Sequence, residues 1–205
     1  MKNRIKILSR REAGGKTASR VGLLAVVVCS LLVIPAAAGG YYWYDSGVKK
    51  PLYMDNELVA EFGAGSLGES AVERAEPGAS RIRAGGGASV FRVGSAGAVM
   101  QKSASLKPGA AVSPVFREGG NPGGRMMSLP GNVIVFFKTD WTEQDVKGWA
   151  AAKKLEIVSK LDVGGNAYVL KTGPGLESLN TANMIQESGE VEAATPNWWK
   201  PVQRK

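Results

Sequence analysis

The C-terminal third of this 205-residue chain is predicted to have an α+β fold. Three observations support this: β-branched and aromatic runs of strand length, apolar residues at helical spacing between them, and Gly or Pro where one pattern gives way to the next. They give the order strand, helix, strand, strand, helix, strand over residues 131–199. A smaller segment, β-rich and rich in Gly and Ala, precedes it at residues 51–130.

The first half of this domain begins with the run NVIVFFK, residues 132–138, whose composition predicts a strand. Thr142 is expected to N-cap a helix over residues 143–154, with Asp145 completing an imperfect capping box. The apolar positions of this helix share one face; they are Val146, Trp149, Ala150 and Leu155.

The second half is predicted to contain two more strands, a helix and a closing strand. Their expected ranges are 156–161, 167–171, 177–188 and 191–195. Gly164-Gly165-Asn166 forms the turn before the third strand, and Gly189 suits a left-handed helix end. The complete order is that of a ferredoxin-like βαββαβ domain, an antiparallel sheet with two helices on one face. The opposite face is then open to solvent or to a partner.

The segment before this domain shows weaker patterns. Three short strands are predicted at residues 58–62, 89–93 and 111–116. Asp55-Asn56 suits a tight turn and predicts a hairpin between residues 52–54 and 58–60. The Ala- and Gly-rich stretches at 71–84 and 96–110 are expected to be loosely ordered, and residues 39–50 to form a connector.

The charge and the missing residue types exclude several functions. Seven of the 26 basic residues but only one of the 18 acidic ones lie in residues 1–20, so this stretch supplies +6 of the net charge of +8. The rest lacks a basic stripe for nucleic acid. The chain has no His, and its single Cys is Cys29, so nucleophile systems that need His and the usual zinc sites are excluded. We therefore expect no enzyme activity, no metal and no cofactor.

Residues 1–38 are expected to direct export. The apolar run Val21–Ile34 follows a basic start and precedes Ala36-Ala37-Ala38, which predicts a signal peptide cleaved after Ala38. Alternatively the segment is an uncleaved inner-membrane anchor, with Tyr41-Tyr42-Trp43-Tyr44 as an interfacial belt. In both cases the C-terminal domain lies outside the cytoplasm, in the periplasm or secreted, and any membrane contact is through this segment alone.

Three runs of the C-terminal domain carry a family resemblance. They are NVIVFFKTDWTEQDVKGWAAAKKLEIVSKLD, GGNAYVLKT and GEVEAATPNWW. In this order they resemble the propeptide of subtilisin-like serine proteases. The upstream runs PLYMDNELVAEF and AVSPVFREGG are similar to a leading segment of some bacterial members. Thr195 departs from the pattern, because the family usually has an acidic residue there.

The resemblance implies that the open sheet face packs on two helices of a protease. With Val133, Val135 and Phe137 facing the core, alternation places Ile134 and Phe136 on the open face. Large apolar side chains there favour a binding surface, although the leading segment could also cover them. Glu190 and Glu192 are expected to cap partner helices, or to be ordinary solvated acids.

The resemblance also implies that the C-terminal tail lies in the protease cleft. The expected cleft-binding residues are Pro196, Asn197, Trp198, Trp199 and Lys200, followed by the last residues, 201–205. Trp198 is equally compatible with a partner's pocket and with this domain's own core. Trp199 is expected to be exposed, since adjacent strand residues face opposite ways.

Because no protease sequence follows the domain, the resemblance implies a stand-alone propeptide. It would bind a subtilisin-like protease in trans, as an external chaperone, an inhibitor or both, and we expect that protease to be encoded nearby. Two alternatives stay open: an envelope-anchored interaction module without a protease partner, and a fragment of a protease precursor.

Overall fold

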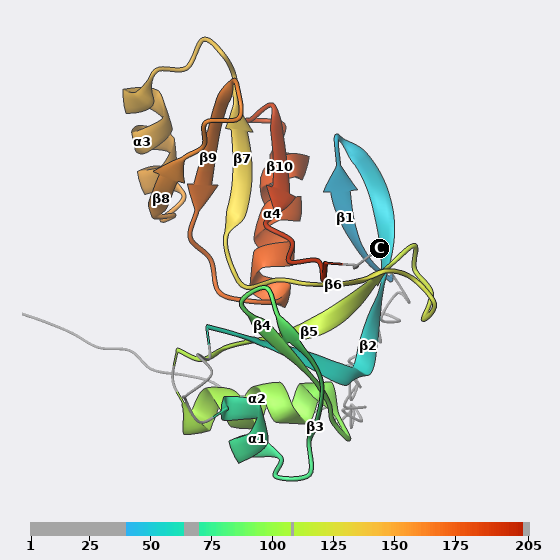
Figure 1. The fold of residues 1–205 in the computed structure, drawn as a ribbon. Helices are drawn as coiled ribbons and strands as arrows, with labels where there is room; N and C mark the ends of the chain where they lie inside the picture. Colours follow the sequence, from blue (N-terminus) through green and yellow to red (C-terminus); the bar gives the residue numbers. More distant parts are fainter. Residues whose placement is uncertain (1–39, 64–69, 108, 203–205) are drawn as a thin grey trace, which may run out of the picture. The chain divides into compact units, whose positions relative to one another are not determined.

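The computed structural model describes residues 40–63, 70–107 and 109–202, which belong to one compact unit. In this part of the chain two antiparallel sheets are present, one of six strands and one of four (Figure 1). An α+β fold with antiparallel sheets is therefore confirmed. The predicted export segment, Val21–Ile34 with Ala38, lies outside the described residues.

The four-stranded sheet and its helices occupy the C-terminal part. The elements are β7 (Val133–Phe137), α3 (Glu143–Ala152), β8 (Ile157–Lys160), β9 (Asn166–Leu170), α4 (Leu176–Ser188) and β10 (Ala193–Pro196). The strands lie in the order β10-β7-β9-β8, and each neighbouring pair is antiparallel. Each element lies within about two residues of its predicted range, because periodicity and end signals agree throughout this part of the chain.

The ends of the two helices follow their local sequence. Thr142 Oγ accepts a hydrogen bond from the Asp145 N–H, and the Asp145 carboxylate accepts one from the Thr142 N–H, so the capping box is complete. Helix α4 ends at Gly189, which has φ 66° and ψ 7°. This left-handed conformation carries no Cβ penalty in glycine.

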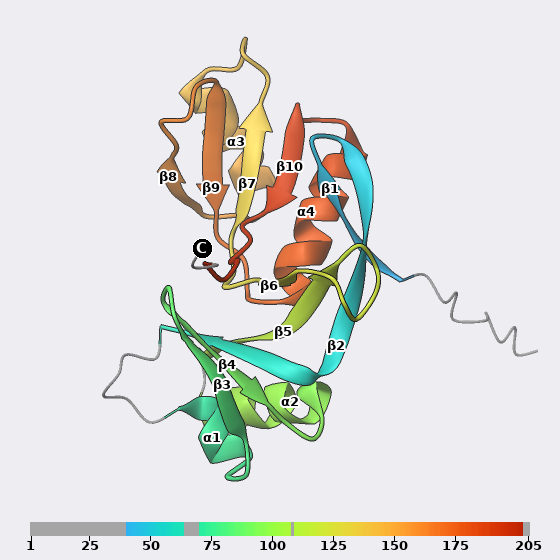
Figure 2. The same ribbon diagram turned by 45° about the vertical axis from the view of Figure 1, so that its right-hand side comes forward.

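The core of the four-stranded sheet lies between the sheet and both helices. Val133, Val135 and Phe137 point inward, as predicted, and are fully buried. They pack against Val146 of α3, and against Ala182 and Ile185 of α4, among others. Both helices thus cover one face of the sheet, and Figure 2 shows them on its far side.

The six-stranded sheet is built from the leading part of the chain. Its strands are β1 (Tyr41–Asp45), β2 (Val48–Phe62), β3 (Ser80–Gly85), β4 (Ala88–Arg92), β5 (Ala111–Glu118) and β6 (Met126–Ser128). They lie in the order β3-β4-β2-β5-β6, and β1 pairs with the first half of β2. The strands predicted at 58–62 and 111–116 lie within β2 and β5, and the one predicted at 89–93 matches β4 to within one residue at each end.

The hairpin predicted at Asp55-Asn56 is wrong, because β2 continues through these residues. A bulge between Asp55 and Val59 takes up the turn-forming residues without reversing the chain. Asp55 is held by Arg117 of the neighbouring strand, whose Nη2 lies 3.0 Å from the carboxylate. One long strand therefore replaces two short ones.

Residues 41–50 are not a connector but the hairpin of β1 and the start of β2. The turn residues Ser46 and Gly47 have φ of 51° and 77°. Two successive positive φ values are those of a type I′ turn, which matches the twist of the flanking strands. The aromatic residues that suggested a membrane belt thus form a strand, in which Trp43 is buried.

The Ala- and Gly-rich stretches contain regular structure, against expectation. Helices α1 (Ala71–Ala75) and α2 (Ala96–Leu106) each begin at a serine N-cap. Val72, Phe91, Ala96 and Val99 are buried in one cluster with Val59 of β2. Small residues let the short helices approach each other and the sheet closely, so apolar area is buried although the side chains are small.

Helix α4 joins the two sheets. Leu179 is buried among residues of the six-stranded sheet, including Trp43, Phe116 and Met127. At the start of α4, a Cβ on Gly175 would come within 2.7 Å of Pro114 Cδ. This close approach explains why a glycine, with φ 69° and ψ −127°, precedes the helix. No helix within the described residues is long and apolar enough to cross a membrane.

Candidate functional site

The face of the four-stranded sheet opposite its helices presents apolar side chains. Ile134 and Phe136 lie on this face and are half-buried. The register places Val169 and Ala167 of β9 beside them on one side, and Thr195 and Ala193 of β10 on the other. The result is a continuous face of apolar and small residues, which we call the open face.

The leading segment does not cover these two side chains. Among the described residues, none of the hydrophobic clusters formed by the six-stranded sheet includes Ile134 or Phe136. The six-stranded sheet instead contacts α4 along most of its length, from Leu179 to Glu187, the edge strand β10, and the tail that follows β10. The open face is therefore apolar where Ile134 and Phe136 are partly exposed, which favours a protein-binding surface.

Glu190 is not part of the open face. Its carboxylate accepts hydrogen bonds from Lys153 Nζ at 2.8 Å and from Trp149 Nε1 at 2.7 Å, so it is bound to α3. The hydrogen bond from Lys153, and to a smaller extent the one from Trp149, holds the pKa of Glu190 below its ordinary value. Glu192 is exposed, and its backbone N–H donates to the Phe136 carbonyl. The structure thus brings Glu192, but not Glu190, next to the face strand β7.

The first tail residues continue strand β10. Pro196 is buried and pairs with Val133, and the Asn197 N–H donates to the Asn132 carbonyl at 3.2 Å. Beyond Asn197 the chain leaves the four-stranded sheet and contacts the six-stranded sheet. The five predicted tail residues are therefore divided between two surfaces.

Trp198 and Trp199 dock on the six-stranded sheet. The Trp198 ring meets the rings of Trp43 and Phe116 edge to face, with centroids 5.4 and 5.7 Å apart. Trp199 is half-buried against Phe62, so the expectation that it is exposed is wrong. Lys200 Nζ lies 5.5 Å from the centre of the Trp43 ring, within the range of a cation–π contact.

Two tyrosines of the predicted interfacial belt connect β1 with α4, a role that the sequence analysis did not predict. The hydroxyls of Tyr42 and Tyr44 both donate to Glu187, at 2.8 and 3.0 Å. The bond to Glu187 raises the pKa of Tyr42, and burial followed by the same bond raises the pKa of Tyr44. The two-residue Ser-Gly loop after an aromatic run was the available sign of this hairpin.

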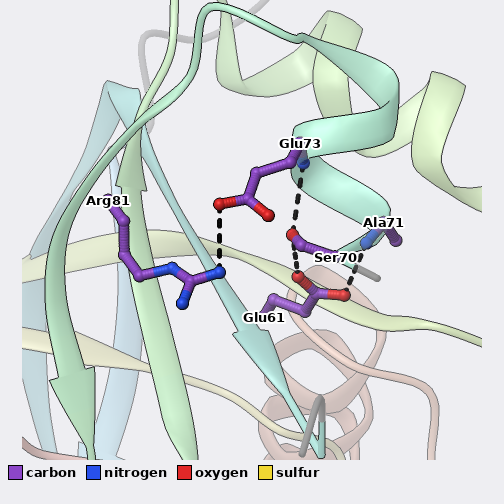
Figure 3. Close-up of polar contacts among 5 residues, drawn as sticks. All are labelled: Glu61, Ser70, Ala71, Glu73 and Arg81. Atoms are coloured by element: carbon purple, nitrogen blue, oxygen red, sulfur yellow. Dashed lines mark hydrogen bonds and ion pairs between the residues drawn. The ribbon is translucent and has the colours of Figure 1, made fainter. Parts of the chain in front are cut away.

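A polar cluster in the leading segment has a structural role. Glu61 is buried, and its carboxylate accepts hydrogen bonds from Ser70 Oγ and from the Ala71 N–H, the latter at 2.8 Å (Figure 3). Ser70 in turn accepts from the Glu73 N–H, and Glu73 pairs with Arg81. The cluster caps the start of α1. Across the described ranges, no group of three or more His, Cys, Asp or Glu residues could hold a metal ion.

Comparison with known proteins gives one family. The family model of the fervidolysin N-terminal prodomain matches residues 125–197, which comprise β6 and the whole four-stranded sheet with its helices. No curated protein and no solved structure matches the chain. The C-terminal part is thus similar to a subtilase prodomain, a type of domain that is not itself catalytic.

Proposed function

We propose that this chain binds a subtilisin-like serine protease in trans and assists its folding, inhibits it, or does both. The match of residues 125–197 to a subtilase prodomain family supports a protease of this class as the partner. The strand order β10-β7-β9-β8 with both helices on one face supports a ferredoxin-like domain of the propeptide type.

The uncovered open face is the observation that carries this proposal. Ile134 and Phe136 are large, apolar and only half-buried on a face without a covering element of the described chain. Burying such a side chain from a fully exposed state contributes about 1.5–3 kcal/mol, and because these two are already partly buried, only the remaining fraction is available to a partner. A partner that presents a flat apolar surface, such as a pair of packed helices, would gain this free energy on binding.

Binding to the native protease would act on both its folding and its activity. A partner that binds the native state and not the unfolded state stabilises the native state by mass action. If the tail then occupies the cleft, substrate is excluded from it. Chaperone and inhibitor are therefore two results of the same contacts, and their balance depends on how long the complex lasts.

The proposal includes the cellular setting. We propose that residues 1–38 export the chain, and that the partner is a secreted protease encoded nearby. The exposed carboxylate of Glu192 would interact more favourably with the N-terminus of a partner helix than with its C-terminus. Glu190 could contribute there only by leaving Lys153 and Trp149.

A double substitution on the open face tests the proposal. Ile134→Asp with Phe136→Asp should weaken both inhibition and folding assistance by about 100-fold or more, because two charges would be desolvated at the interface. The measurements are inhibition of a subtilisin-like protease, its recovery on refolding, and complex formation on gel filtration.

The matched control carries two aspartates at exposed apolar positions elsewhere. Val48→Asp with Met184→Asp changes side chains that are 55% and 61% exposed, on β2 and α4. This control should bind as the unsubstituted chain does. Equal potency of the open-face variant, or no complex of the unsubstituted chain with any subtilisin-like protease tried, would refute the proposed function.

A further inference from the structure

The C-terminal tail has a built seat on the six-stranded sheet of its own chain. At the backbone, the Trp199 N–H donates to the Ser128 carbonyl at 2.9 Å, and the Ser128 N–H donates to the Trp199 carbonyl at 3.0 Å. The tail therefore pairs with β6 as a short antiparallel strand does. We call the residues that contact Trp198 and Trp199 the seat; they are Trp43, Phe62, Gly86, Phe116 and Ser128.

Side chains fix the second tryptophan in the seat. Trp199 Nε1 donates to the Gly86 carbonyl at 3.0 Å, in the turn between β3 and β4. The Trp199 ring also meets the Phe62 ring edge to face, with centroids 5.9 Å apart. Gly86 approaches so closely that a Cβ there would lie 3.3 Å from Trp199 Nε1.

Trp198, the first tryptophan of the tail, docks with its indole N–H lacking a hydrogen-bond acceptor among the described residues. Trp43 Nε1 and Trp198 Nε1 are both buried, and neither meets an acceptor among the described residues. A buried donor without a partner costs free energy that it regains on reaching an acceptor. The apolar contacts of the Trp198 ring thus stabilise the docked state, while its N–H destabilises it.

Beyond Trp199 the described part of the tail, residues 200–202, is held by the contact of Lys200 with the Trp43 ring and by few others. Arg83 Nη1 donates to the Val202 carbonyl at 3.4 Å, a long hydrogen bond. A groove of about 840 Å³ lies between this end of the tail and the β3–β4 hairpin. Ile82, Arg83, Lys200 and Val202 are among the residues that line it. The tail is therefore anchored at its two tryptophans and weakly attached after them.

We propose that the seat is an intramolecular latch, closed in this structure, which opens to release Trp198 and Trp199. For the protease consequence, this proposal rests on the proposed function. An extended segment that lies in a protease cleft offers its backbone N–H and C=O to the cleft. Those of Trp199 are already bonded to Ser128, so one tail cannot occupy the seat and a cleft together.

The latch then sets the apparent affinity of the tail for any cleft. When the binding-competent state is only a fraction of the population, the apparent dissociation constant rises by the inverse of that fraction. A latch that is open about 1% of the time would weaken tail insertion by about 100-fold. The open face is not part of the seat, so it stays available while the latch is closed.

A pair of neighbouring glycines provides the test. Gly86 and Gly87 have φ of 63° and 76° in the same turn, but a Cβ on Gly87 would meet no atom within 4 Å. Asn tolerates this left-handed conformation, so both substitutions strain the turn equally. Gly86→Asn crowds the Trp199 ring, which must shift by a few tenths of an ångström, whereas Gly87→Asn does not.

The first readout is accessibility of the tail to chymotrypsin, which cuts extended chains after aromatic residues. In the full-length chain, cleavage after Trp198 or Trp199, followed by mass spectrometry, should be about tenfold faster in Gly86→Asn than in Gly87→Asn. Phe62→Ala, which removes the ring against Trp199, provides a second latch variant. Far-ultraviolet circular dichroism identifies variants that keep the fold.

The second readout is inhibition of a subtilisin-like protease by the same chains. Latch variants should inhibit the protease more strongly, by the same factor by which their chymotrypsin cleavage is faster. Unchanged chymotrypsin cleavage in both folded latch variants would overturn the latch. Faster cleavage without stronger inhibition, in a chain that inhibits, would overturn the mutual exclusion of seat and cleft. If no chain inhibits or binds the protease, the proposed function fails, and the cleavage ratio still decides whether the latch exists.

Discussion

Glu61 illustrates at the residue scale how a buried charge can be structural. Its relative exposure is 2%, yet both carboxylate oxygens are used, one by Ser70 Oγ and one by the Ala71 N–H. These bonds connect the end of β2 to the start of α1, on either side of residues 64–69. A carboxylate is suited to this place because the first N–H groups of a helix point at it.

We predict that Glu61→Gln destabilises the fold by about 1–3 kcal/mol, as measured by urea unfolding. The amide keeps the shape of the side chain, but it loses the charge and places an NH₂ group against one of two donors. Glu73→Gln is the control, because it removes only the exposed ion pair with Arg81. Its effect should be below about 0.5 kcal/mol, and equal losses in the two variants would contradict the structural role of Glu61.

The two tryptophans of the tail show what sequence reasoning misses at single residues. Alternation along a strand placed Trp199 outward, and the four-stranded sheet indeed does not bury it. Its partners, Phe62 and Gly86, lie more than 100 residues away in the sequence. A local pattern gives the direction of a side chain but cannot show which distant surface the side chain meets.

The helices of the four-stranded sheet show at the element scale how local signals determine structure. Helix α3 begins at a capping box and places Val146 and Ala150 in the core, as expected. The pKa of Asp145 is held below its ordinary value by the hydrogen bonds from the Thr142 hydroxyl and backbone N–H. A carboxyl group whose pKa is lower in the folded state than in the unfolded state stabilises the fold at pH values above its unfolded-state pKa. This contribution is lost as the pH falls through the folded-state pKa.

We therefore predict that Asp145→Asn lowers the Tm at pH 7 and that the difference closes on acidification. The unfolded-state pKa of Asp is about 3.9, so the gap should narrow below about pH 4. Asp140→Asn, at an exposed position outside the capping box, should follow the unsubstituted chain at every pH. A gap that stays constant to pH 2.5 would exclude the carboxylate as its cause.

Local sequence signals gave a wrong prediction for β2, a strand that pairs with different strands along its length. Strand β2 pairs with β1 along its first half and with β4 along its second, while β5 spans both. Asp55-Asn56 is therefore at a bulge, although its residue types equally suit a turn. Propensity cannot distinguish the two, because the choice depends on strands that come later in the chain.

At the scale of the whole molecule, the two sheets share one set of contacts. Leu179 of α4 is part of the core of the six-stranded sheet, and Asn183 Nδ2 donates to the Tyr42 carbonyl. The Gly175 N–H donates to the Leu129 carbonyl. The sequence predicted each sheet separately, at least in part, but gave no sign of how they join, since these contacts link residues far apart along the chain.

We predict that both sheets unfold in a single transition. Trp43, Trp198 and Trp199 report on the six-stranded sheet, while Trp141 and Trp149 pack in the core of the other. Urea curves from tryptophan fluorescence and from far-ultraviolet circular dichroism should coincide, as they do for one cooperative unit. Substituting Trp141 and Trp149 by Phe should leave the fluorescence midpoint within error of the dichroism midpoint of the same variant. Two separate midpoints would show that the contacts through α4 are too weak to couple the sheets.

The paired indoles of Trp43 and Trp198 have a spectroscopic consequence. Their rings are 5.4 Å apart and inclined at 75°, a fixed and asymmetric arrangement of two identical chromophores. Such a pair couples its electronic transitions, and the coupling of its intense far-ultraviolet bands gives a pair of circular dichroism bands of opposite sign. The molecule therefore carries its own optical label for the position of its C-terminal end, and no dye or added cysteine is needed to follow it.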